Sequence, residues 1–256
     1  MSHSLVSLQR ENGIARLTIE RPQKLNALTV PLRNELLDAL ATVAADDQTR
    51  CVILSGRGRA FCTGQDLDER APILDGQDMD LGKALEEGLN RVMLALVNLP
   101  QPVIAAVQGA AVGAGASLAL ACDIVIAAED ASFHFSFAKI GLSGDSGATW
   151  LLPKKIGPAR ASRVLLLGEA ITARMGEEWG VVGQVVPADQ LLEVTMRDAE
   201  KIASLSAVST QSIKKLLIAA STNSLADQLA LESLKQAEAG RSAAYKDSLA
   251  AFLRRG

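Results

Sequence analysis

The sequence predicts an α/β domain followed by a C-terminal helical region, and three observations support this fold class. Strand-like apolar runs alternate with helical patterns up to about residue 186, whereas the pattern from residue 187 to 255 is helical throughout. Hydrophobic residues make up 48% of the 256 residues and aromatic residues only 3%, which predicts an aliphatic, alanine-rich core. We therefore divide the chain into a core at residues 1–187 and a helical region at residues 188–256.

Apolar runs with the length and composition of β-strands recur along the core. They span residues 5–8, 14–20, 51–54, 102–107, 123–127, 132–137 and 183–186. The first two flank Asn12-Gly13, and an Asn-Gly pair is the strongest short signal for a hairpin. In residues 132–137 phenylalanine alternates with other residues, so we expect Phe133, Phe135 and Phe137 to share one apolar face.

Apolar residues at helical spacing predict the helices. These span residues 30–45, 81–99, 116–121, 146–156, 158–167 and 172–179, and then residues 187–255 with breaks near 204–206, 222–223 and 240. Thr29 and Thr172 are suitable N-caps, and Pro31 suits the first turn of its helix. Gly157-Pro158 separates two of the predicted helices because proline disfavours a helical conformation in the preceding residue.

A turn rich in glycine and alanine, Gly109–Gly115, lies between a predicted strand and a predicted helix. The first turn of a helix leaves N–H groups unpaired, and small residues let them approach an oxygen that carries or develops negative charge. Residues 60–67 predict a second strand, turn and helix start, and the polar residues 68–79 predict a mobile loop or a short helix. Leu118 replaces the third glycine of the dinucleotide-binding motif. A plain connection is the alternative interpretation.

Composition argues against several functional classes. The net charge of −3 disfavours a nucleic-acid surface. Cys51, Cys62 and Cys122 are odd in number and lie in or beside apolar runs, so we expect buried thiols in a cytoplasmic protein. The N-terminus lacks the features of a signal peptide, and no apolar run is long enough to predict a membrane span. The two histidines and three scattered cysteines have no metal-ligand spacing, so we expect no metal site.

Five motifs in register carry a resemblance to a known family. They are Arg21-Pro22 with Leu25-Asn26-Ala27-Leu28, Gly56 with residues 60–67, residues 102–109, residues 113–123, and Trp179-Gly180-Val181-Val182 with Val185-Val186-Pro187. Together they resemble the crotonase superfamily, which has the enoyl-CoA hydratase/isomerase fold. The resemblance implies a spiral of β-β-α repeats and C-terminal helices that assemble a homotrimer or a dimer of trimers. It also implies an acyl-CoA thioester as the substrate and no separate cofactor, because coenzyme A is part of that substrate.

The resemblance also implies the binding residues. In the family two backbone N–H groups hold the thioester carbonyl as it becomes an enolate, and the matching motifs place these donors at Thr63 and Ala114. The residues expected along the substrate and its coenzyme A moiety are Lys24, Leu25, Ala27, Gln65, Asp66, Leu67 and Gly113. The corresponding aspartate is mostly structural in the family, so a structural role for Asp66 stays open.

Two departures from the family pattern bear on the reaction. Hydratases of the family use two glutamates around one water, and the resemblance places these positions at Ser117 and Phe137, which cannot transfer a proton usefully. One carboxylate remains, Asp145, and the following residues 147–153 resemble those of family members that use a single acid to move a proton. The residues alone leave an alternative, in which Asp145 is only a helix N-cap.

The resemblance therefore implies an acyl-CoA isomerase in which Asp145 is the catalytic acid and base. Such an enzyme moves a double bond from the β,γ to the α,β position, as in fatty acid metabolism, or converts an epoxyphenylacetyl-CoA to an oxepin-CoA, as in phenylacetate catabolism. Two alternatives stay open at this point. One is an enoyl-CoA hydratase, which is a lyase, and the other is a non-catalytic homologue that only binds acyl-CoA.

Overall fold

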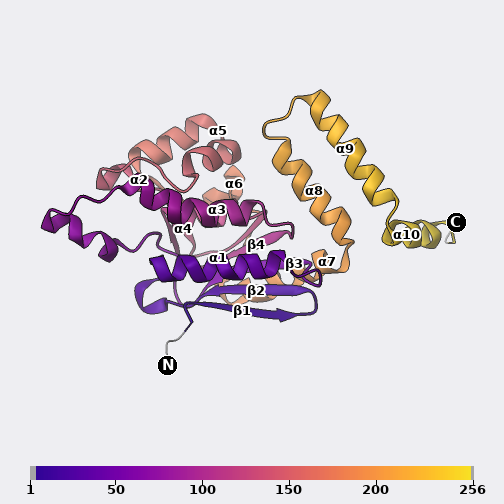
Figure 1. Cartoon of the computed structure of the whole chain (residues 1–256), viewed down its shortest axis with the longest axis horizontal. Helices are drawn as coiled ribbons and strands as arrows, with labels where there is room; N and C mark the ends of the chain where they lie inside the picture. Colours follow the sequence, from indigo (N-terminus) through magenta and orange to yellow (C-terminus); the bar gives the residue numbers. More distant parts are fainter. Residues whose placement is uncertain (1–3, 255–256) are drawn as a thin grey trace.

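Two β-sheets form the centre of the molecule in the computed structural model, which describes residues 4–254 (Figure 1). The main sheet has the order β1-β2-β3-β4-β6-β9, and only β1 and β2 pair in antiparallel fashion. Its strands are β1 (Val6–Glu11), β2 (Ile14–Ile19), β3 (Cys51–Gly56), β4 (Val103–Val107), β6 (Ile124–Ala128) and β9 (Gln184–Val186). A smaller sheet contains β5 (Ala110–Val112), β7 (Ser132–His134) and β8 (Ala170–Thr172). The α/β prediction is confirmed.

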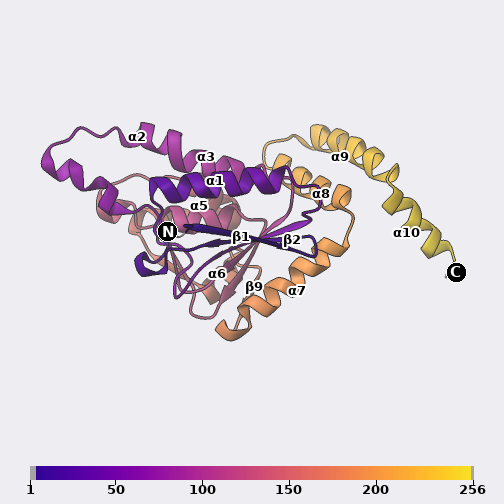
Figure 2. The ribbon, with the colours of Figure 1, turned by 60° about the horizontal axis from the view of Figure 1, so that its bottom comes forward.

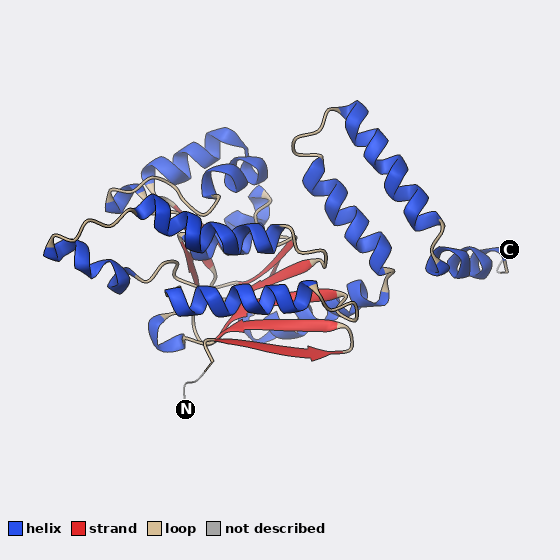
Figure 3. Cartoon of the chain, in the orientation of Figure 1, coloured by secondary structure: helices blue, strands red, loops and turns tan. Residues whose placement is uncertain are grey.

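Helices cover both faces of the main sheet, as Figures 2 and 3 show. On one face, α1 (Val30–Ala44), α3 (Asn90–Val97) and α4 (Ala114–Ala121) share an apolar core with the strands. On the other face, α7 (Leu191–Ser204) places its apolar side against isoleucines of β3, β4 and β6. By packing, α7 therefore belongs with the sheet, although it lies in the predicted helical region. The division after residue 187 stays a prediction.

The last three helices extend away from the sheet (Figure 1). They are α8 (Ala207–Ala219), α9 (Leu225–Gly240) and α10 (Ala243–Leu253), and the gap after α7 together with the two gaps between these helices confirms the three predicted breaks. One buried cation joins α8 to the core: Lys214 Nζ lies 2.9 Å from Asp123 Oδ2 and donates to the carbonyl oxygen of Gln101 at 3.0 Å. Between residues 4 and 254, no helix is both long and apolar enough to cross a membrane.

Local signals in the sequence explain most element boundaries. Asn12 and Gly13 have φ values of 51° and 77°, which suit a tight hairpin between β1 and β2. The side chain of Thr29 accepts the Leu32 N–H at the start of α1, which confirms the predicted cap. Thr172 caps α6 (Ala173–Trp179) in the same way.

Some predicted boundaries were wrong. The strand predicted over residues 132–137 ends at His134, and residues 60–67 form only isolated bridges rather than a strand. β5 and β8 were not predicted, because three residues are too few to show a pattern. The break predicted at Gly157-Pro158 is confirmed, because Gly157 has non-helical φ and ψ values of 78° and 160° at a kink within α5 (Ala148–Leu167), whereas the helix start predicted at residue 146 lies at Ala148. The helix predicted over residues 81–99 consists of α2 (Leu81–Ala84), a π-helical turn and α3.

Candidate active site

A cavity of about 670 Å³ lies between the segment that follows β3 and the loop that precedes α5. Its lining residues are Gln65, Leu67, Asp68, Arg70, Ala71, Ile73, Leu74, Leu81, Gly82, Leu85, Ile140, Leu142, Ser143 and Asp145. Most of these side chains are apolar, as expected for a site that binds an acyl group. The cavity brings together three of the predicted site residues, Gln65, Leu67 and Asp145.

Two backbone segments, residues 61–65 and 111–115, run side by side at this site, and we call them the backbone cradle. The Val112 N–H donates to the carbonyl oxygen of Cys62 at 2.9 Å. A Cβ atom on Gly115 would lie 2.1 Å from that same carbonyl oxygen, closer than any real contact. Glycine is therefore required here because the two backbones touch, and the contact fixes one segment against the other.

The cradle presents the N–H group of Ala114, the first residue of α4. Gly113 precedes it with a φ of 53°, and its own N–H donates to the His134 carbonyl oxygen at 2.8 Å. The Ala114 N–H has no partner among the described residues, as expected in the first turn of a helix. It lies beside the other segment, since a Cβ on Gly64 would be 3.3 Å from the Ala114 nitrogen. The structure therefore leaves the predicted donor at Ala114 free.

The predicted donor at Thr63 does not fit the structure. Its N–H donates to the carbonyl oxygen of Leu25 at 3.1 Å, and its hydroxyl donates to the same oxygen at 3.2 Å. The next residue but one, Gln65, is different. The Gly64 carbonyl oxygen accepts the Leu28 N–H, and the Asp66 N–H donates to the Leu28 carbonyl oxygen, so the groups on both sides of Gln65 pair with Leu28. The Gln65 N–H therefore points away from Leu28.

The Gln65 amide is therefore the second free donor of the cradle. No acceptor for it lies within residues 4–254, and Gln65 lines the cavity whereas Thr63 does not. The correction has a simple physical reason. In a regular strand the amides of Thr63 and Gln65 would face the same side, but Gly64 between them has a φ of 81° and breaks this alternation, so Thr63 pairs with Leu25 while the Gln65 amide faces away. Gln65 was predicted only as a binding residue.

Two carboxylates line the cavity: Asp68, which is exposed and paired with Lys24, and Asp145, which is not paired with a cation. Asp145 is not the N-cap of α5, because α5 begins at Ala148 after Gly147, and no side chain caps it. The Oδ1 atom of Asp145 is buried and has no hydrogen-bond partner among the described residues. Burial raises the pKa of Asp145, and the neighbouring Ser146 hydroxyl and the charge of Arg70 offset this only in part. The alternative that Asp145 is only a helix cap is therefore wrong.

The three phenylalanines are all buried, although only Phe133 lies in β7. Phe137 lies beside both the cradle and the loop that carries Asp145. A Cβ atom on Gly113 would lie 3.6 Å from its ring, and one on Gly144 would lie 4.0 Å from it. Phe137 therefore supplies an apolar backing between the Ala114 donor and the Asp145 loop.

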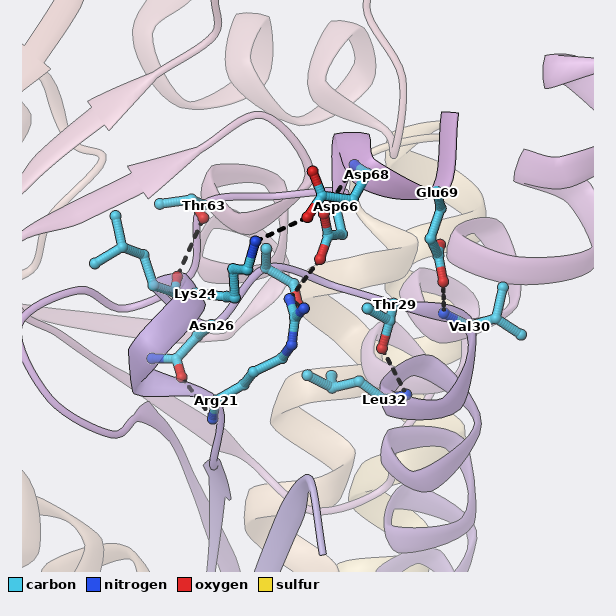
Figure 4. A network of polar contacts seen from close by, with 12 residues as sticks. Arg21, Lys24, Asn26, Thr29, Val30, Leu32, Thr63, Asp66, Asp68 and Glu69 are labelled. Carbon is cyan, nitrogen blue, oxygen red and sulfur yellow. Dashed lines mark hydrogen bonds and ion pairs between the residues drawn. The ribbon is translucent and has the colours of Figure 1, made fainter. Parts of the chain in front are cut away.

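A polar network stands behind the residue 61–65 segment, as Figure 4 shows. The Asp66 carboxylate lies 2.6 Å from Arg21 and accepts the Asp68 N–H at 3.0 Å, at the start of the helical turn Leu67–Asp75. Burial works to raise the pKa of Asp66, but the bonds from Asp68 and Arg21 outweigh it and leave the pKa lowered. Asp66 therefore holds the backbone in place, which supports its structural role.

Three further predicted binding residues, Lys24, Leu25 and Ala27, lie in the same network. The Leu25 carbonyl oxygen is the one that holds Thr63, and the Ala27 carbonyl oxygen accepts from Arg21 at 3.0 Å. Lys24 is exposed and lies 2.8 Å from Asp68, which raises the pKa of the Lys24 ammonium group. This segment supports the cradle from behind, and the Lys24 side chain lies at the surface in its pair with Asp68.

The remaining reactive side chains do not face the cavity. Cys51, Cys62 and Cys122 are buried, are not paired in disulfides, and burial raises each thiol pKa to about 12. Burial also lowers the pKa of His134, whose ring lies 3.0 Å from the Ser132 hydroxyl. Within residues 4–254 no group of three or more His, Cys, Asp and Glu side chains could hold a metal ion.

The chain is similar to known proteins over nearly its whole length. The protein-family model described as "Enoyl-CoA hydratase/isomerase" matches residues 9–256. A curated relative from Escherichia coli K12, 1,2-epoxyphenylacetyl-CoA isomerase, is 43% identical over 95% of this chain and 93% of its own length. A probable enoyl-CoA hydratase from Rhodobacter capsulatus is 39% identical over 99% of this chain and 96% of its own length.

Solved structures show the same architecture. The crystal structure of a putative enoyl-CoA hydratase/isomerase from Mycobacterium abscessus superposes with a TM-score of 0.94 at 35% identity. The match covers 98% of this chain and 96% of the other chain. A putative enoyl-CoA hydratase from Streptomyces coelicolor A3(2) gives a TM-score of 0.92 at 34% identity, over 98% and 92% of the two chains. The predicted family fold is confirmed.

Proposed function

The chain belongs to the enoyl-CoA hydratase/isomerase family, and on that premise we propose that it is an acyl-CoA isomerase that uses a single carboxylate, Asp145. The observation that carries this proposal is the environment of the Asp145 carboxyl group. It lines an apolar cavity, its Oδ1 atom is buried without a partner, and burial raises its pKa. Because its pKa is raised, such a carboxylate is better suited than an exposed one both to accept a proton and to return it to the substrate.

The backbone cradle supplies the second half of the mechanism. The N–H groups of Gln65 and Ala114 hydrogen-bond the thioester carbonyl oxygen and stabilise the negative charge that develops on it. Both are fixed before the substrate arrives, so no reorganisation is needed during the reaction. Removal of one such donor costs about 3 kcal/mol of transition-state stabilisation in well-studied enzymes.

The proton transfer then needs only one residue. The Asp145 carboxylate removes a proton from Cα of a β,γ-unsaturated thioester, and the electron pair moves into the carbonyl to give a dienolate. Asp145 returns the proton to Cγ, and the double bond is then between Cα and Cβ. No water enters and no atom leaves, so the single carboxylate balances the reaction.

The absence of other acids in the sequence supports isomerisation over hydration. Residues 113–122 and 131–144, which hold the two departures at Ser117 and Phe137, contain no Asp or Glu. Hydration needs one group to activate water and another to deliver a proton. A hydratase is nevertheless the second candidate function, because the relative from Rhodobacter capsulatus is named a probable enoyl-CoA hydratase.

Two finer assignments belong to the same proposal. The 43% identical relative supports an epoxidised phenylacetyl thioester as a substrate, with a role in phenylacetate catabolism, beside simple β,γ-enoyl thioesters. The exposed apolar side chains of the last helices, among them Leu225, Leu229 and Phe252, support a homotrimer or a dimer of trimers.

The test compares wild type with Asp145→Asn on a β,γ-unsaturated acyl-CoA and on crotonyl-CoA, by ultraviolet absorbance and mass spectrometry. We expect wild type to shift the double bond and leave crotonyl-CoA unhydrated. Asp145→Asn should lose at least about 10²-fold in kcat while it still binds the thioester. Asp47→Asn is the matched control, since Asp47 is exposed in the loop that enters β3 at the opposite end of that strand.

Two results would overturn the assignment. Brisk hydration of crotonyl-CoA by wild type would favour the hydratase. Equal binding by both proteins with no turnover of either substrate, or of the epoxyphenylacetyl thioester, would favour a protein that only binds acyl-CoA.

A further inference from the structure

The wall of the cavity that belongs to the helical turn Leu67–Asp75 carries one cation, Arg70, among its lining residues. Asp145 lines the same cavity from the loop before α5. The two side chains form no ion pair, because no Asp145 oxygen lies within 4.0 Å of an Arg70 nitrogen. A positive and a negative group therefore face one cavity with space between them.

The Arg70 guanidinium is not neutralised by its other neighbours. Its only hydrogen bond among the described residues runs from Nη1 to the Met79 sulfur at 3.2 Å, and a thioether is a weak acceptor. The two nearest acids along the chain are engaged elsewhere. Glu69 pairs with buried Arg33 at 3.2 Å, and Asp68 pairs with Lys24 at 2.8 Å.

The Asp145 carboxylate also lacks a charged or hydrogen-bonded partner at one of its oxygens. Its buried Oδ1 has no partner, and burial works against the charged form. Arg70 is the cation whose charge lowers the pKa of Asp145. The other charged groups near these walls are Asp68, the mutually paired Lys83 and Glu87 of the α2 side, and exposed Lys139 before the Asp145 loop.

We propose that Arg70 is a positioning residue for the reaction: across the cavity, its guanidinium keeps the Asp145 side chain a carboxylate that is ready to accept the substrate proton. This inference rests on the proposed function. A bound acyl group displaces water from the cavity and makes the charged form of Asp145 still less favourable. It also lowers the local dielectric, which strengthens the attraction from Arg70 at the moment when it is needed.

The test is the pH dependence of kcat/KM for wild type, Arg70→Met and Arg70→Lys on a β,γ-unsaturated acyl-CoA. Without the cation, the apparent pKa of the acid limb should rise by about one unit. The loss of activity should therefore approach about tenfold below the limb and stay within about threefold on the plateau. Lysine keeps the charge and should restore most of the wild-type profile.

Arg91→Met is the matched control, because Arg91 is exposed on α3 and does not line the cavity. We expect its profile to match that of wild type. An unchanged acid limb in Arg70→Met would overturn the proposal, whether the activity is intact or falls equally at every pH. In the second case Arg70 only supports the wall.

A titration that needs no turnover separates this proposal from the proposed function. Carboxyl ¹³C NMR, with Asp145→Asn to assign the signal, should show Asp145 titrating at a higher pH in Arg70→Met than in wild type. If Asp145→Asn stays active, the proposed function fails, and the titration still reports on the Arg70 effect. If Asp145 titrates at the same pH in both proteins, the Arg70 proposal alone fails.

Discussion

The two sides of the cavity are built in different ways. The backbone cradle is held by main-chain contacts that are buried, with Gly64 and Gly115 placed where a Cβ would meet another backbone. The opposite side, residues 67–85, which we call the outer wall, is held by two side-chain pairs, the exposed Lys24–Asp68 pair and the pair of Glu69 with buried Arg33. Leu74 in this wall is 90% exposed, and Leu67 is 60% exposed.

This difference matches what each side has to do. The donors that we propose for the thioester oxygen must stay in one place for every substrate, and a close-packed backbone cannot shift without loss of its core contacts. The acyl group varies among family members, and a wall of exposed apolar side chains can adapt to it. We therefore expect changes in the cradle to affect stability and rate together, and changes near the outer wall, other than at Arg70, to affect substrate affinity alone.

The largest effect should come from a methyl group inside the cradle. In Gly115→Ala the new Cβ meets the Cys62 carbonyl oxygen at 2.1 Å, so the two segments must separate. We expect a loss of about 3 kcal/mol or more in the free energy of unfolding, measured by urea denaturation, and no detectable turnover. Gly240→Ala in α9 is the control, because nothing lies within 4 Å of its Cβ position. A stable, active Gly115→Ala protein would show that the cradle is not rigid.

A smaller effect should follow the loss of the amide that ties the cradle to its support. Asn26 is fully buried, and its Nδ2 donates to the carbonyl oxygens of Arg57, Ala60 and Phe61 at 2.9, 2.8 and 3.2 Å. Asn26→Ala should cost about 2 kcal/mol in urea denaturation and lower kcat more than it raises KM. Asn90→Ala should leave both unchanged, since Asn90 makes no side-chain hydrogen bond among the described residues.

The smallest effect on stability should come from Lys24→Met beside the outer wall. The Lys24–Asp68 pair is exposed on both sides, so its loss should leave the urea midpoint unchanged. If Lys24 meets a phosphate of coenzyme A, KM for the thioester should rise about threefold at low salt while kcat stays the same. Lys201→Met on α7 is the control. A KM equal to that of wild type would remove Lys24 from the binding site.

Local patterns predicted much of the fold because they act over a few residues. Asn12-Gly13 specified a hairpin, Thr29 specified the start of α1, and Gly157 marked the irregular point inside α5. The predicted cradle segments lie side by side, and Ala114 has a free amide. The error at Thr63 arose because the Thr63 amide pairs with Leu25 and the Gln65 bridge pairs with Leu28, and both partners lie far away in the sequence.

The sequence by itself determined the family, the alternation of strands and helices, and the presence of one acid, Asp145, where the hydratase positions hold none. These are properties of residue type and local order, which are fixed before the chain folds. Only the tertiary structure decided that Gln65 rather than Thr63 has the free amide, that Asp145 does not cap α5, and that Arg70 faces the same cavity. Each depends on contacts between segments that only packing brings together.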